Sequence, residues 1–217
     1  ILFVVLLITV LILWLRARGK FMFLDGVVYN RAAVVEPWKQ FRKLGNSLFR
    51  FYIVIAIVAV LGIGIIVGGS LLIALPNIQS QQFGGPAIVA VVLGSVLMLA
   101  FIIVLILIDM ATHDFIVPIM YQRSLTIQPA WGVFRRELLS GRGGVFTLYV
   151  LMKILLAIAI GAIAATVTLL TCCIAALPYI GTVILLPVYV FDRCYSLSFL
   201  EQFGPEWQFY RHADRLN

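Results

Sequence analysis

The chain alternates long apolar runs with shorter segments that carry almost all of its charged residues. Each apolar run is continuous, a pattern typical of membrane-spanning helices and unlike the alternating pattern of barrel strands. The runs predict an all-α integral membrane protein of about five transmembrane helices, joined by amphipathic cytoplasmic connector helices. The expected spans are Ile1 to Leu15 and about Phe51 to Leu75, Ala87 to Ile108, Val145 to Leu170 and Tyr179 to Phe191.

The first apolar run, Ile1 to Leu15, is short for a membrane span. As a helix it would be about 22 Å long, whereas the hydrocarbon layer is roughly 30 Å thick. We therefore expect the N-terminus to be truncated, with several preceding residues missing. A secretory signal peptide is the competing interpretation, but its basic residues precede the apolar core, whereas Arg16, Arg18 and Lys20 follow this run.

The distribution of charge predicts the orientation of the chain. Pro76 to Pro86 and Thr171 to Tyr179 contain no Asp, Glu, Lys or Arg. The basic residues other than Lys153 all lie in three segments, residues 16–50, 109–144 and 192–217. Because cytoplasmic loops are enriched in Lys and Arg, these three segments are expected in the cytoplasm. The N-terminus is then outside and the C-terminus inside a bacterial cytoplasmic membrane.

The composition indicates a lipid rather than an aqueous environment. Hydrophobic residues make up 63% of the chain and charged residues 12%, against roughly 45–50% apolar residues in soluble domains. The net charge of +7 could indicate nucleic acid. The basic residues flank apolar spans, however, where attraction to anionic lipid headgroups explains them. We therefore expect anionic membrane lipids as partners, and no nucleic acid.

An internal repeat of about 92 residues organises the sequence. Tyr29-Asn30-Arg31, Pro37-Trp38 and Phe41-Arg42-Lys43 correspond to Tyr121-Gln122-Arg123, Pro129 with Trp131, and Phe134-Arg135-Arg136. The single membrane domain then consists of unit one at about residues 1–75, unit two at 87–170 and a partial third unit at 179–217. The copies have the same orientation, which weakens the case for a transporter built from inverted repeats.

Each repeat contains a connector with an apolar stripe at helical spacing. Trp38, Phe41 and Leu44 form the stripe in the first copy, and Trp131, Phe134 and Leu138 form it in the second. We expect surface helices at residues 37–45 and 129–139, with the aromatic rings at the acyl boundary. The candidate interface or headgroup-binding residues are Trp38, Phe41, Arg42, Lys43, Trp131, Phe134, Arg135, Arg136 and Trp207. The alternative is that the connectors only anchor the loops, without specific headgroup recognition.

Small residues recur every four positions within two of the expected spans. Gly64 and Gly68 form one such pair, and Ala157, Gly161 and Ala165 form a longer row. Such rows allow helix backbones to approach closely within a membrane. They predict close packing, either within the molecule or against a partner.

Lys153 is the charge expected well inside a span. Its ammonium could reach the interface, pair with Asp109 or Asp114, or contact a substrate. Asp109 and His113 share a helical face, but two ligands do not make a metal site. The three cysteines do not have the spacing of a metal site or a disulfide framework. The sequence has no phosphate-binding loop, serine nucleophile motif or zinc-protease motif, so we expect no catalytic residue and no cofactor.

At the repeated Tyr-x-Arg, Pro-Trp and Phe-Arg-basic segments, the chain resembles a group of uncharacterised bacterial multi-pass membrane proteins. These proteins are similar to the membrane portion of some glycerophosphodiester phosphodiesterases. The resemblance covers residues 20–205 and implies a bacterial membrane module without a catalytic domain. We expect a non-enzymatic structural or accessory subunit that packs against partner proteins or lipids. The alternative is a small transporter or channel in which Lys153 with Asp109 or Asp114 lines a polar path.

Overall fold

A computed structural model describes residues 2–29, 35–79, 85–141, 143–170, 186–204 and 207. The elements in this part of the chain are all helical, which confirms the all-α fold class. They are α1 (Leu2–Tyr29), α2 (Val35–Gln40), α3 (Arg42–Gln79), α4 (Gly85–Ala111), the π-helical segment η1 (Thr112–Ile116), α5 (Val117–Arg123), α6 (Ile127–Val133), the π-helical segment η2 (Phe134–Leu139), α7 (Gly143–Leu170) and α9 (Leu186–Glu201).

Three helical stretches are long and apolar enough to cross a membrane. They are Arg42–Leu75, Ile88–Arg123 and Gly143–Leu170. Each coincides with one of the expected spans to within one residue or extends beyond it, since a helix pairs all of its backbone N–H and C=O groups internally, as lipid requires. The expected outside segment at 171–179, and the first part of the expected fifth span, lie outside the described residues. The count of five spans therefore stays a prediction.

The chain forms two compact units, and each is assembled from two separate parts of the sequence. Unit 1 contains residues 1–17 and 45–113, and unit 2 contains residues 18–44 and 114–217. Along the chain, a long helix, short helical elements and a long helix follow one another twice. The division into units follows contacts rather than sequence similarity, so the repeat itself stays a prediction.

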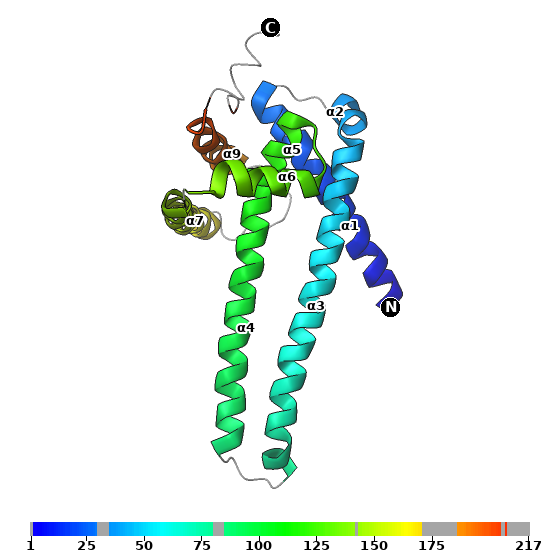
Figure 1. Cartoon of the computed structure of the whole chain (residues 1–217), viewed down its shortest axis with the longest axis vertical. Coiled ribbons are helices and arrows are strands. Elements are labelled where there is room, and N and C mark those ends of the chain that lie inside the picture. The colour runs from blue at the N-terminus through cyan, green and yellow to red at the C-terminus, as the bar shows by residue number, and fades with distance from the viewer. Residues whose placement is uncertain are drawn as a thin grey trace. The chain divides into compact units, whose positions relative to one another are not determined.

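Unit 1 is built on α3 and α4, two long helices that lie side by side (Figure 1). They approach closely at two glycines. A Cβ at Gly62 would overlap the ring of Phe101, and one at Gly94 would overlap the Ser70 hydroxyl. By contrast, a Cβ at Gly64 or Gly68 would meet no described atom within 4 Å. The described helices therefore contact each other at Gly62 and Gly94 rather than at the expected pair of Gly64 and Gly68.

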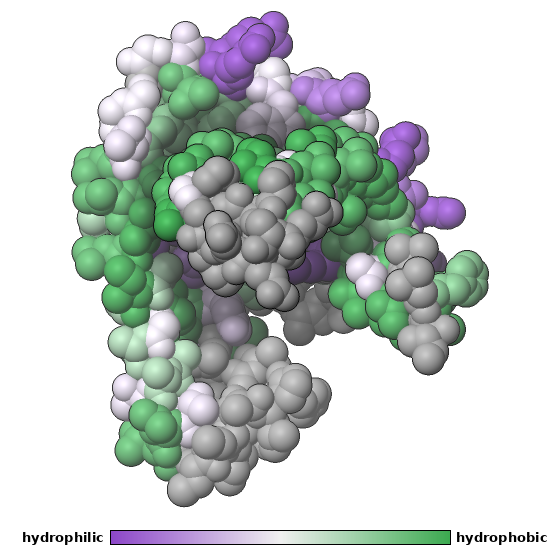
Figure 2. Space-filling model, turned by 90° about the horizontal axis from the view of Figure 1, so that it is seen from below, coloured by the Kyte–Doolittle hydropathy of each residue, from purple (hydrophilic) through white to green (hydrophobic). Residues whose placement is uncertain are grey.

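Most large apolar side chains of α3 and α4 are exposed. Figure 2 shows the same character on one face of the molecule, where hydrophobic residues cover most of the described surface. Such an exposed apolar surface is stable in hydrocarbon, because lipid tails solvate it. The surface of unit 1 is thus that of a protein in a bilayer.

Unit 2 has a core of aromatic rings, which we call the aromatic cluster. Its members are Phe115, Phe134, Phe146, Tyr149, Tyr195, Phe199 and Phe203. Phe115 lies near its centre, with ring centroids 4.8 Å from Tyr149, 5.2 Å from Phe146 and 5.4 Å from Phe134. Phe134 is stacked on Phe115, Tyr149 is tilted and Phe146 is edge-on, and offset-stacked and edge-on geometries are the favoured arrangements of aromatic pairs. The cluster joins η1, η2, α7 and the end of α9 into one core.

Candidate functional site: a buried charge network in unit 2

The structure places Asp114 in the π-helical segment η1, just before a proline. Pro118 has no N–H to donate to the carbonyl of Asp114, so the regular α-helical hydrogen bond cannot form there. A wider helical turn accommodates this interruption, and such turns are frequent at functional sites. Asp114 itself is almost completely buried.

Two side chains from one face of α7 meet Asp114. The Tyr149 hydroxyl donates a hydrogen bond to the Asp114 carboxylate at 3.0 Å, and the Lys153 ammonium lies 3.4 Å from the same carboxylate. Tyr149 and Lys153 are four residues apart, a spacing that places both on the same side of a helix. The sequence of α7 therefore presents a hydroxyl and an ammonium to one acidic partner.

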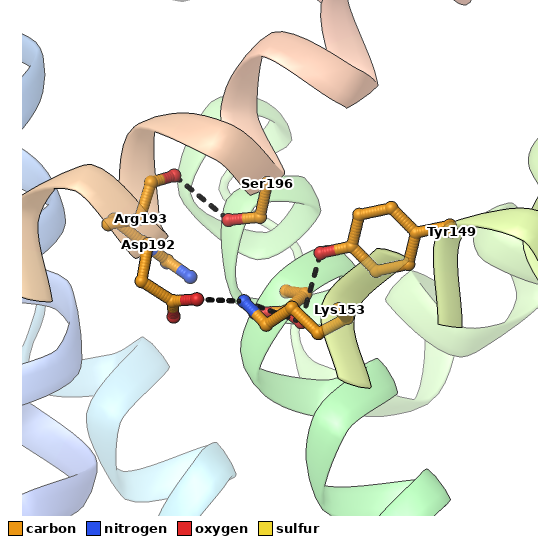
Figure 3. A network of polar contacts seen from close by, with 6 residues as sticks. Tyr149, Lys153, Asp192, Arg193 and Ser196 are labelled. Atoms are coloured by element: carbon orange, nitrogen blue, oxygen red, sulfur yellow. Dashed lines mark hydrogen bonds and ion pairs between the residues drawn. The ribbon is translucent and has the colours of Figure 1, made fainter. Parts of the chain in front are cut away.

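Lys153 also joins α7 to α9. Its ammonium lies 2.7 Å from the Asp192 carboxylate, the closest ion pair of the group. Figure 3 shows Lys153 and Asp192 pointing toward each other, with Tyr149 extending from the same helix as Lys153. Asp114, Tyr149, Lys153 and Asp192 form what we call the Lys153 network. One lysine thus connects η1, α7 and α9.

Burial makes these contacts strong. The side chains of Asp114, Lys153 and Asp192 are 2%, 14% and 27% exposed. Charges this far from water attract one another strongly, and each requires its partner to offset lost hydration. Arg193, which follows Asp192, is also buried, and the Ser196 hydroxyl donates to its backbone carbonyl. Polar and charged groups are therefore concentrated inside unit 2.

The sequence predicts only part of this network. The pairing of Lys153 with Asp114 is among the predicted alternatives, and the structure brings the two together. Asp109, the other predicted partner, is exposed and belongs to unit 1, so its pairing with Lys153 stays a prediction. Asp192 and Tyr149 were not anticipated. One signal could have indicated Asp192, since it is the one acidic residue between positions 145 and 199.

The first connector, residues 35–44, places its apolar stripe against protein. Phe41 is buried, with its ring centroid 5.1 Å from that of Tyr121 and 6.1 Å from that of Phe21. The Tyr121 hydroxyl in turn donates to the Asp25 carboxylate at 2.8 Å. The prediction that Phe41 faces the acyl boundary is therefore wrong, because aromatic side chains of unit 2 cover it. Trp38 is half-buried, and Arg42 and Lys43 are exposed.

The second connector, residues 127–139, also packs its phenylalanine against protein. Phe134 is buried in the aromatic cluster, so the prediction that it faces the acyl boundary is also wrong. Its ring lies edge-on to the half-buried Trp131. The predicted helical conformation is observed over α6 and η2, and Arg135 and Arg136 are exposed. Both connectors thus expose their basic residues and bury their phenylalanines.

Trp207 also lies against protein rather than at an open interface. Its side chain is 3% exposed, and the Arg123 guanidinium stands 4.8 Å from its ring centroid. Arg123 also makes a two-pronged ion pair with Glu137, at 2.7 and 2.9 Å. Trp207 therefore packs against protein, with a cation–π contact to Arg123 on its ring.

The described residues contain no group of three or more His, Cys, Asp or Glu side chains that could hold a metal ion. Asp109 and His113 accordingly have no third ligand within the part of the chain that the structure describes. The arrangement of the Lys153 network is suited to joining helices by charge, or to holding an ion or proton near a carboxylate.

A family model matches residues 1–186. The chain belongs to the family of unknown function DUF7544. No curated protein and no solved structure matches the chain. Membership in the DUF7544 family therefore covers α1 through α7 but brings no assigned activity, and a functional hypothesis has to rest on the residues themselves.

Proposed function

We propose that the protein is a non-enzymatic structural or accessory subunit of a bacterial cytoplasmic membrane. It packs against partner proteins or lipids through exposed apolar helices. The proposal includes about five spans, an N-terminus outside and a C-terminus in the cytoplasm. The exposed apolar surface of α3 and α4 supports the membrane part of the proposal.

The observation that carries the non-enzymatic part is that the groups of the Lys153 network bond to one another. Lys153 has a carboxylate on two sides, and Tyr149 donates to one of them. Groups arranged in this way stabilise a helix assembly and leave little polar capacity for a reacting substrate. The network therefore favours a role in holding α7 and α9 together.

A small transporter or channel is the second candidate, and one observation favours it. Lys153 lies in a stretch long enough to span a membrane, and the carboxylate of its partner Asp192 is partly exposed. Intramembrane ion pairs that reach a water-filled path are typical of transporters. In that case the network would exchange partners as an ion or proton passes.

Two measurements on the full chain distinguish these functions. Native purification followed by mass spectrometry should recover a companion membrane protein in a fixed ratio. Proteoliposomes containing the purified chain should show no flux of protons, K⁺ or Cl⁻ above empty liposomes. Isolation of the chain alone, together with a flux abolished in a folded variant carrying Lys153→Met, Asp114→Asn and Asp192→Asn, would establish the transporter instead.

A further inference from the structure

The first connector presents a group of exposed basic residues at the start of a membrane-spanning stretch. Lys39, Arg42 and Lys43 are all exposed, and the stretch long enough to span a membrane begins at Arg42. A single acidic residue, Glu36, accompanies them in α2. Basic side chains at this position meet the phosphate layer of a bilayer, where anionic headgroups attract them.

The positions of these basic residues are set by packing on the opposite side of the connector. Phe41 and Leu44 are buried in the protein, and the Phe41 N–H bonds to the Pro37 carbonyl at 2.9 Å. This bond links α2 to α3. The hydrogen bond and the buried side chains together fix the backbone that carries the three basic residues. A fixed arrangement of cations loses less side-chain entropy on binding an anion than a mobile one.

A further arginine adds positive charge beside this group. Arg18 is 7% exposed, and its guanidinium lies 4.8 Å from the centroid of the Trp38 ring. Burial, and next the positive charge of Arg42, lower the pKa of Arg18 from its ordinary value. The positive charges of Arg18 and Arg42 repel each other, and an anion bound near both would offset that repulsion.

The second connector has a different balance of charge. Glu137 neutralises Arg123 through the two-pronged ion pair, and the Arg136 guanidinium donates to the Gly132 carbonyl of its own helix. Arg135 and Arg136 are exposed, as are Arg42 and Lys43 in the first connector. The second connector therefore supplies a control in which two exposed arginines can be removed with the same loss of charge.

We propose that Lys39, Arg42 and Lys43 of the first connector bind the phosphate group of an anionic phospholipid, beside the stacked pair of Arg18 and Trp38. This inference rests on the membrane placement in the proposed function, but not on the accessory role. The recognised chemistry is a phosphate diester anion, which a guanidinium and two ammonium groups hold by charge-assisted hydrogen bonds. The lipid source is favoured because the site adjoins a membrane span.

The test compares two variants with the same loss of charge. The full chain in a neutral detergent is titrated with phosphatidylglycerol or phosphatidylcholine, and bound lipid is counted by native mass spectrometry. Wild type should prefer phosphatidylglycerol. Since each basic residue accounts for about fivefold in attraction to an anionic surface, Arg42→Gln with Lys43→Gln should weaken phosphatidylglycerol binding on the order of tenfold or more. Arg135→Gln with Arg136→Gln should weaken it clearly less.

Three controls keep the result open to refutation. Arg42→Lys with Lys43→Arg should retain the preference, which excludes a loss of folding as the cause. Equal weakening by the two Gln variants would overturn the proposal in favour of diffuse attraction, as would equal binding of both lipids by wild type. Full displacement of the lipid by soluble glycerol phosphate would overturn the lipid as the source of the phosphate.

Discussion

The two compact units share an apolar composition but use their side chains in opposite ways. In unit 1, α3 and α4 expose most of their large apolar side chains and meet at the small residues Gly62 and Gly94. In unit 2, aromatic rings are buried together, and the Lys153 network is enclosed beside them. The two units therefore illustrate two solutions to helix packing in the same apolar chain.

The difference follows from what stabilises helices in lipid. Apolar surface does not drive association there, because lipid tails solvate it as well as protein does. Close backbone approach, aromatic packing and polar pairs must supply the stability instead. Unit 1 relies on the first of these, whereas unit 2 relies on the other two. Substitutions inside unit 2 should consequently have larger effects than most substitutions in unit 1.

The largest expected effect is that of Lys153→Met. It leaves the buried Asp114 carboxylate without its cation, and breaking a buried ion pair in this way costs about 3–5 kcal/mol. Reversible unfolding in mixed detergent micelles, followed by tryptophan fluorescence, measures the loss. Adding Asp114→Asn and Asp192→Asn should restore much of it, because the two carboxylates that Lys153 pairs with are then neutral. An exposed control, Lys39→Met, should change little. A stable Lys153→Met variant would show that the network contributes little to unit 2.

Phe115→Ala should have the next largest effect. The side chain is 2% exposed at the centre of the aromatic cluster, and a buried Phe→Ala change costs about 3 kcal/mol at the lower end of its range. The lower end applies because the Phe115 side chain of the unfolded protein is surrounded by lipid or detergent rather than by water. The same unfolding measurement applies. Phe191→Ala is the matched control, since Phe191 belongs to α9 but is exposed. Equal losses in the two variants would contradict a packed core in unit 2.

A smaller effect should distinguish two glycines within unit 1. Gly94→Ala introduces a methyl group that overlaps the Ser70 hydroxyl, which already donates to the Ile66 carbonyl. Overpacking of this kind costs about 1–3 kcal/mol. Gly64→Ala meets no described atom within 4 Å and should stabilise α3 by about 0.5–1 kcal/mol through reduced backbone entropy. The unfolding free energies of the two variants should therefore change in opposite directions, and a shared direction would mean that α3 and α4 do not meet at Gly94.

These comparisons also show which features can be predicted from the sequence. The helical spans depend on the length of continuous apolar runs, which is a local property, so α3, α4 and α7 were located correctly. In the predicted stripe of Trp38, Phe41 and Leu44, the last two side chains are buried. The sequence does not predict that protein covers them, because apolar spacing is the same whether lipid or protein covers a helix face.

The Lys153 network was only partly predictable for a related reason. A charge inside an apolar run requires a partner, and this requirement indicates Asp109 or Asp114, of which the structure brings Asp114 to Lys153. The contribution of Asp192 depends on where α9 packs, which no local pattern contains. Helix periodicity likewise assumes a regular α-helix, whereas η1 interrupts the register before Pro118. Tertiary packing and backbone irregularity therefore limit the prediction of the site.

The smallest expected effect concerns the ion pair between Arg123 and Glu137, which resembles the Lys153 network in chemistry but not in environment. The two side chains are 29% and 44% exposed, compared with 14% and 2% for Lys153 and Asp114. Water and salt screen exposed charges, and such pairs contribute about 0.2–1 kcal/mol. A double-mutant cycle with Arg123→Gln and Glu137→Gln measures the coupling directly, since effects on Trp207 alone cancel.

The salt dependence of the coupling free energy distinguishes the exposed pair of Arg123 and Glu137 from the buried Lys153 network. The coupling between Arg123 and Glu137 should fall toward zero as ionic strength increases, because solvent ions reach both groups. The coupling between Lys153→Met and Asp114→Asn should stay nearly unchanged, because these two side chains are largely buried. If both couplings fell equally with salt, the Lys153 network would be accessible to water. That result would remove the physical difference between the two ion pairs and would favour a polar path through unit 2.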